Sequence, residues 1–191
     1  EVTVRNISML SKQADTAVCT ALVRAGAAVI NDVSGFRDPA MVQVAAESDC
    51  GVVVMHMKGE PGTMQQNPHY NDVVSEVTAF FEEKMNVLVN AGFPEENILL
   101  DPGIGFGKKM EHNLALMAHP EAWERLGRPS LMALSMKSVF NDLLGLPVES
   151  RGPATQTATA LCYTRGYAWH RVHDARAASQ ALRLADAFMN A

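Results

Sequence analysis

The feature that most constrains the fold is an alternation, along nearly the whole chain, of short apolar runs with longer segments of helical periodicity. Short apolar runs bounded by polar residues are typical of buried strands, whereas a period of about 3.6 residues is typical of amphipathic helices. We interpret as strands the runs 27–31, 51–57, 97–101, 130–135 and 167–172. We interpret as helices the segments 14–25, 39–48, 71–90, 113–126, 137–144, 155–165 and 176–190. Strands that alternate with helices predict an α/β protein with a parallel sheet.

Two prolines bear on the bounds of these helices. Asp38 followed by Pro39 is a typical start for the helix at 39–48, with the carboxylate as cap and proline at the first position. Pro120 interrupts the segment 113–126, because proline cannot donate the backbone hydrogen bond of a helix interior.

Polar or charged side chains stand at the end of each predicted strand, where core packing alone favours apolar ones. The stretches are INDVSGF at 30–36, MHMKG at 55–59, LDPGIGFGK at 100–108, SMKS at 135–138 and RVHD at 171–174. In a parallel α/β barrel the carboxyl ends of the strands meet at one mouth, where catalytic groups collect. One such stretch indicates no more than a turn, but five together predict a functional site.

The stretch at 100–108 is the most informative of these. Asp101 ends a strand, and a proline and three glycines then form a loop with little side-chain bulk, which a flat ligand can approach. The stretch is not a phosphate-binding P-loop, because Lys109 follows Lys108 where that motif has Ser or Thr. Its glycine spacing also differs from the dinucleotide-binding fingerprint.

These motifs, with TMQ-x-x-P at 63–68, resemble those of the dihydropteroate synthases, the pterin-binding enzymes of folate biosynthesis. Their order and approximate spacing agree from about residue 26 to the end of the chain. The resemblance implies a TIM (β/α)8 barrel of the dihydropteroate synthase type, incomplete at its N-terminus, with residues 1–191 forming one pterin-binding domain. The chain has 191 residues, against about 250 in a full barrel, and the family's opening strand and first mobile loop have no counterpart.

The family reaction condenses 6-hydroxymethyl-7,8-dihydropterin diphosphate with 4-aminobenzoate, releasing diphosphate with assistance from Mg²⁺. The resemblance implies that Asp101, Lys137 and Arg171 are catalytic, and it identifies no metal ligand. The substrate-binding residues implied are Asn31, Met55, Asp101, Phe106, Lys137, Ser138, Arg171 and His173.

The residue types suit these roles. An ionised Asp101 accepts two charge-assisted hydrogen bonds from the amidine-like edge of a pterin. Asn31 donates and accepts at once, and Lys137 offers a point charge to the ring carbonyl. Met55 and Phe106 either pack on the ring or belong to the core. Asp32 lies on the other face of its strand, which favours a structural role.

Arg171 and His173 are two residues apart. On a strand they face the same side, and together they suit a diphosphate clamp. The same pair argues against one alternative, a pterin-dependent methyltransferase. Another alternative, a non-catalytic pterin-binding or scaffold relative, stays open.

Several positions depart from the family pattern. Its pterin-binding aspartate falls on Leu10 or Lys12, its arginine between the serine and the lysine of the fifth motif is Met136, a glycine is Ala133 and a small residue is Tyr167. Each lost buried charged hydrogen bond costs on the order of 2 kcal/mol. We therefore expect weak or absent turnover with pterin binding retained.

The composition bears on partners and location. A net charge of −5 argues against a nucleic-acid partner, and no apolar run approaches the length of a membrane span. Cys19, Cys50 and Cys162 form an odd set without a C-x-x-C pair, which favours reduced structural thiols and a cytoplasmic protein. The resemblance implies a homodimer through the last helices, where Arg183, Leu184 and Phe188 lie on one stretch.

Overall fold

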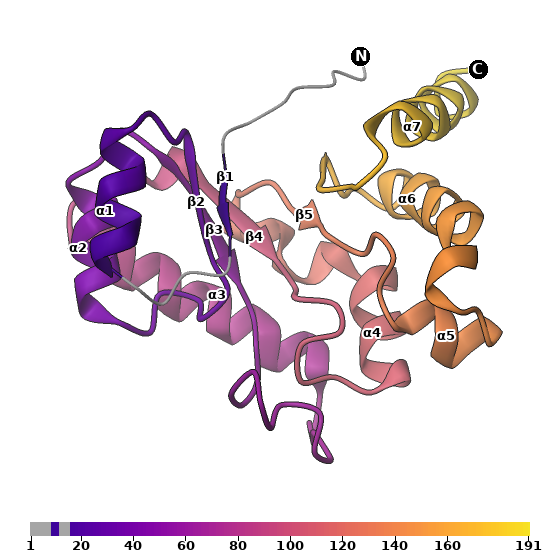
Figure 1. Ribbon diagram of the computed structural model, residues 1–191, viewed down its shortest axis with the longest axis horizontal. Coiled ribbons are helices and arrows are strands. Elements are labelled where there is room, and N and C mark those ends of the chain that lie inside the picture. The colour runs from indigo at the N-terminus through magenta and orange to yellow at the C-terminus, as the bar shows by residue number, and fades with distance from the viewer. Residues whose placement is uncertain (1–8, 12–15) are drawn as a thin grey trace.

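The computed structural model describes the backbone of residues 9–11 and all of residues 16–191. Within these residues, strands alternate with helices from one end to the other (Figure 1). The strands are β1 (Met9–Ser11), β2 (Val29–Asp32), β3 (Gly51–Met55), β4 (Ile98–Asp101), β5 (Leu131–Met132) and β6 (Trp169–His170). The α-helices are α1 (Thr16–Arg24), α2 (Pro39–Ala46), α3 (Val73–Asn90), α4 (Met110–Ala118), α5 (Val139–Leu144), α6 (Gly152–Thr164) and α7 (Ala175–Met189). Short 3-10 helices are η1 (Glu95–Asn97), η2 (Pro120–Leu126) and η3 (Val148–Ser150).

The strands form a parallel arc in chain order. Strands β1 to β4 pair in sequence, and β5 pairs with β6. A parallel bridge between Leu100 and Ser130 connects the two sheets, next to a hydrogen bond from the Leu100 amide to the Pro129 carbonyl at 3.1 Å. The prediction of a parallel α/β protein is confirmed, and the carboxyl ends of the strands share one edge.

Two boundary features predicted from prolines are confirmed, although several other helix bounds differ from the predicted ones by two or three residues. The Asp38 carboxylate accepts the Ala40 amide at 2.9 Å, with Pro39 at the first helical position. Helix α4 ends at Ala118, and Pro120 opens the 3-10 helix η2, so the predicted break is confirmed. The predicted start of the first helix, at residues 14 and 15, lies outside the described residues.

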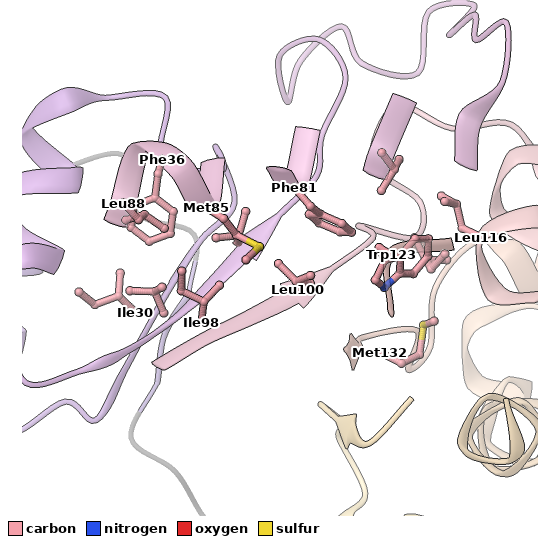
Figure 2. Close-up of a cluster of buried hydrophobic side chains, with 14 of the residues drawn as sticks. Ile30, Phe36, Phe81, Met85, Leu88, Ile98, Leu100, Leu116, Trp123 and Met132 are labelled. Carbon is pink, nitrogen blue, oxygen red and sulfur yellow. The ribbon is translucent and has the colours of Figure 1, made fainter. Parts of the chain in front are cut away.

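Strands β2 to β5 are buried on both of their faces. One faces the helices and forms the large core drawn in Figure 2, where Ile30, Ile98 and Leu100 pack with side chains such as Phe81 and Trp123. The other carries a smaller cluster of Val53, Leu131 and Ala133, with Val29 and Leu99 packed against it. We call this second face the inner face, and side-chain alternation brings Asn31, Met55 and Asp101 onto it.

All five predicted strands are longer than the observed ones, and the difference is largest for the last two. β5 is limited to Leu131–Met132 and β6 to Trp169–His170, so the prediction that Arg171 and His173 lie on one strand is wrong. Arg171 still extends the ladder by one step, since its amide donates to the Met132 carbonyl at 3.0 Å. The chain leaves the sheet beyond it because His173 binds Ser135 and Asp174 caps α7.

Cys19, Cys50 and Cys162 are free and buried, as expected of structural thiols. Among the described residues, no helix is both long and apolar enough to cross a membrane.

Candidate functional site

The candidate site lies at the carboxyl ends of β2, β3 and β4. In the parallel register Asn31 pairs with Val53, and Met55 pairs with Asp101. Asn31, Met55 and Asp101 are all almost fully buried. The structure thus brings together three predicted residues from three strands, at the edge where the sequence placed them.

Asp101 is the most unusual group of this edge. Its Oδ1 accepts the Gly103 amide at 2.8 Å, whereas its buried Oδ2 accepts no hydrogen bond from the described residues. Burial raises the pKa of Asp101, and the positive charges of Lys137, Arg171 and Lys108 together with the Gly103 hydrogen bond oppose that shift. A buried carboxylate with one vacant oxygen and three cations nearby is suited to accept N–H groups from a ligand.

Lys137 approaches Asp101 from the loop after β5. Its Nζ donates a short hydrogen bond to the Ile104 carbonyl and lies 4.5 Å from the centroid of the Phe106 ring. Burial and the nearby Arg171 lower the pKa of Lys137 to about 8, against the opposing effect of Asp101. Lys137 and Phe106, both half-buried, therefore meet over the glycine loop.

The glycine loop, residues 102–107, packs directly on the chain after β3. A Cβ atom on Gly103 would lie 1.9 Å from the His56 carbonyl oxygen, and one on Gly107 would lie 2.2 Å from that of Lys58. Both residues also have a positive φ, which side chains rarely allow. Two of the three glycines of the motif, Gly103 and Gly107, thus mark a close backbone approach.

Asp32 differs from Asp101 although it also ends a strand. Its carboxylate accepts the Ser34 amide at 2.9 Å, the Ser34 hydroxyl at 2.6 Å and the Phe36 amide at 2.8 Å. These three bonds fold the loop after β2. The expected structural role of Asp32 is confirmed.

Arg171 and His173 lie at the other end of the same edge. Arg171 is half-buried, its charge lowers the pKa of Asp101, and its guanidinium makes no hydrogen bond with the described residues. His173 is exposed, and its Nδ1 lies 2.9 Å from the Ser135 hydroxyl. Ser138 is exposed at the start of α5. The structure thus groups Arg171 with Asp101 and Lys137, and it ties His173 to Ser135.

The departures from the family pattern fall in different places. Met136 follows Ser135 in the left-handed region, at φ 61°, and its carbonyl accepts from the Arg151 guanidinium at 3.0 Å. Ala133 is buried on the inner face. Leu10 pairs with Ile30 through β1, whereas Lys12 lies outside the described residues.

Tyr167 does not belong to the mouth. It precedes β6, at the amino end of that strand, and its buried hydroxyl donates to the Leu116 carbonyl at 2.6 Å. This departure from the family pattern therefore lies at the amino end of β6, away from the edge that carries Asp101.

Sequence reasoning assigned no role to Lys108 or His56. Lys108 is buried beneath the glycine loop, and its Nζ lies 2.9 Å from the His56 Nδ1. The available signal was the basic residue at the end of a glycine-rich stretch. Among the described residues, no three His, Cys, Asp or Glu side chains are grouped so as to hold a metal ion.

The chain is similar to known proteins over most of its length. A family model described as "Pterin binding enzyme" matches residues 6–173. Dihydropteroate synthase from Escherichia coli strain K12 is 35% identical over 168 residues, covering 88% of this chain and 60% of the relative. The enzyme of that name from Neisseria meningitidis serogroup B is 40% identical over 172 residues, covering 87% and 60%. The chain thus spans about 60% of the length of these curated relatives.

Solved structures agree in fold. Yersinia pestis dihydropteroate synthase, determined with a sulfonamide drug complex, superposes with a TM-score of 0.90 at 33% identity, over 94% of this chain and 65% of the other. The Thermus thermophilus enzyme in complex with 4-aminobenzoate gives a TM-score of 0.87 at 38% identity, over 93% and 70%. The resemblance and the partial TIM-barrel fold expected from the sequence are confirmed.

Proposed function

The chain belongs to the pterin-binding enzyme family, and we propose that its strand-end site binds a pterin as a dihydropteroate synthase does. The proposed reaction joins the methylene carbon of 6-hydroxymethyl-7,8-dihydropterin diphosphate to the amine of 4-aminobenzoate, with diphosphate as the leaving group. The observation that carries the proposal is the buried Asp101 carboxylate, whose Oδ2 has no donor among the described residues. Relatives crystallised with 4-aminobenzoate and with 6HMPPP support the substrate classes.

In this proposal Asp101 accepts N–H groups from the pterin edge. Asn31, buried on the neighbouring strand end, supplies mixed donor and acceptor atoms to the ring nitrogens. Lys137 turns its ammonium from the Ile104 carbonyl to the ring carbonyl. Phe106 and Met55 border the ring plane, although Met55 is fully buried and also contributes to the core.

The diphosphate is assigned to the other end of this edge, where Arg171 and His173 lie. Arg171 has a guanidinium available for the diphosphate, and His173 lies beyond it in the same loop. Cationic groups here stabilise the negative charge that develops as diphosphate leaves. Ser138 and Lys137 border the 4-aminobenzoate, because the start of α5 is exposed next to the glycine loop.

Mg²⁺ remains part of the proposal only through the family. The described residues offer no carboxylate cluster to hold it and form no metal cage by themselves, and no step above depends on the ion. We also propose that residues 1–191 act as one domain and that the protein is cytoplasmic. A homodimer through α7 is supported by Leu184 and Phe188, which are 61% and 76% exposed.

A second candidate function is a non-catalytic pterin-binding relative. The observation that favours it is Met136, which stands where the family has an arginine. A thioether has no charge with which to stabilise a leaving anion. A methyltransferase has less support, because it has no use for the cation Arg171 at this edge.

One paired experiment separates these functions. Diphosphate release is measured with both substrates, and binding of 6-hydroxymethyl-7,8-dihydropterin is measured by calorimetry with and without diphosphate, in wild type and Arg171→Ala. We expect slow or undetectable release, and a diphosphate-dependent gain in pterin affinity that Arg171→Ala abolishes. Rapid diphosphate release by wild type contradicts the expectation of weak turnover. If diphosphate raises pterin affinity equally in wild type and Arg171→Ala, Arg171 does not bind the diphosphate.

A further inference from the structure

Lys108 is a buried lysine at the base of the glycine loop, and the mechanism above gives it no task. Its side chain is 3% exposed. Its Nζ lies 2.9 Å from the His56 Nδ1, 3.1 Å from the Gly103 carbonyl oxygen, 3.1 Å from that of Phe106 and 3.3 Å from that of His56. Buried lysines are rare unless paired, so this arrangement requires a reason.

The atoms around the Lys108 Nζ need a hydrogen-bond donor. Three of the four are carbonyl oxygens, which only accept hydrogen bonds. Burial and the nearby lysine and arginine charges lower the pKa of His56 to about 2, so its ring is neutral and Nδ1 can be the fourth acceptor. Burial lowers the pKa of Lys108 to about 7, and the Asp101 carboxylate opposes that shift. An ammonium with three N–H groups satisfies this set better than any neutral side chain of similar length.

The loop that Lys108 holds carries the groups of the site. The Gly103 amide orients Asp101. The Ile104 carbonyl and the Phe106 ring both contact Lys137. Two of the carbonyls that Lys108 binds, those of Gly103 and Phe106, enclose this segment. The other, that of His56, belongs to the chain after β3, so one ammonium fastens the loop to the strand end.

We propose that Lys108 is a positioning residue that fixes the glycine loop, and through it Asp101 and Lys137, in the geometry that binds pterin. The inference rests on the proposed function, because that function makes Asp101 and Lys137 the pterin ligands. Lys108 itself touches neither substrate. Replacing Lys108 should therefore weaken pterin binding and leave Arg171, the proposed diphosphate ligand, in place.

The test compares Lys108→Met with a control variant that removes a buried hydrogen bond away from the glycine loop. Met keeps much of the side-chain volume and removes every N–H group. Trp123→Phe is the control, because it removes a buried hydrogen bond from the indole to the Ser130 hydroxyl, 2.8 Å long, at the amino end of β5. For both variants and wild type, calorimetry measures the affinities for 6-hydroxymethyl-7,8-dihydropterin and, separately, for diphosphate. Hydrogen exchange then reports on the amides of Gly103, Gly105 and Phe106.

Lys108→Met should bind the pterin at least tenfold more weakly, with diphosphate affinity within about twofold of wild type and faster exchange at the three loop amides. Trp123→Phe should change neither the pterin affinity nor that exchange. Equal pterin affinity in Lys108→Met and wild type, or an equal loss in both variants, overturns the proposal. Where Lys108→Met does not fold, Lys108→Gln, which keeps two N–H groups, is judged by the same criteria and should show a smaller loss.

The exchange measurement separates this inference from the proposed function. If wild type binds no pterin, the proposed function fails, and Lys108 is still tested by the loop amides. Unchanged exchange at Gly103, Gly105 and Phe106 in the lysine variant then shows that Lys108 does not position the loop.

Discussion

Replacing Asp101 by Asn should separate ligand affinity from stability. In the free protein the Oδ1 of Asp101 accepts the Gly103 amide, and its Oδ2 has no donor among the described residues. An asparagine can keep the first bond through its oxygen and places its NH₂ group where Oδ2 lies. The donors of a pterin edge then meet another donor.

The expected loss follows from the bonds involved. A hydrogen bond to a charged group contributes about 1.5–3 kcal/mol, so replacing one such acceptor by a donor should weaken pterin binding by about 2 kcal/mol, roughly 30-fold. The free energy of unfolding should stay unchanged or rise, because burial penalises the carboxylate charge and asparagine has none. Calorimetry with 6-hydroxymethyl-7,8-dihydropterin measures the first quantity, and urea unfolding at the same pH measures the second.

Asp32→Asn is the matched control. All three internal bonds of Asp32 go to groups of its own loop, one to Oδ1 and two to Oδ2. Asparagine has a single acceptor oxygen, so it loses at least one of them. The variant should therefore lose about 1–3 kcal/mol of stability with a smaller change in affinity than Asp101→Asn. Equal pterin affinity in wild type and Asp101→Asn refutes the assignment of Asp101.

Two further predictions concern the loop and the pH dependence. Gly103→Ala should lower the free energy of unfolding by more than about 2 kcal/mol, in the upper part of the usual range of about 0.5–3 kcal/mol or beyond it, because its Cβ would lie 1.9 Å from the His56 carbonyl oxygen. Urea unfolding equal to wild type contradicts the close approach. Burial lowers the pKa of His170 to about 4, below its unfolded value of about 6.5, so the unfolded chain binds the extra proton between these values and stability falls as pH drops from about 6.5 to about 4. His170→Phe should reduce that slope by about 1.4 kcal/mol per pH unit, measured by urea unfolding across this range, and an identical slope in both proteins shows that His170 is not buried in its neutral form.

The order of elements and the location of the site could be predicted from the sequence, whereas strand lengths could not. Apolar periodicity identified the runs that became β2, β3 and β4, and the polar residue at each end located Asn31 and Asp101. The run at 167–172 looked like one strand. β6 is shorter because the chain beyond Arg171 turns to make contacts with Ser135, and such a tertiary contact leaves no periodic signal.

The roles of individual residues were predictable only where the backbone conformation alone determines the residue type. Three glycines predicted a tight loop, and the loop packs against two carbonyls. Sequence reasoning assigned no role to Lys108, yet the structure buries it. Its role depends on carbonyls from residues 56, 103 and 106, and those come together only when two strand ends are side by side.

Asp32 and Asp101 show two different hydrogen-bonding environments for a buried carboxylate at this edge. Both end a strand, and both are almost completely buried. Asp32 is saturated with donors from its own loop, as expected of a group that stabilises the fold. Asp101 has one donor and a vacant oxygen, with cations near enough to shift its pKa, although none forms an ion pair with it among the described residues. A buried charge left in this state costs stability that a ligand with paired N–H groups recovers. The difference in hydrogen bonding between the two carboxylates is therefore the physical reason to assign binding to Asp101.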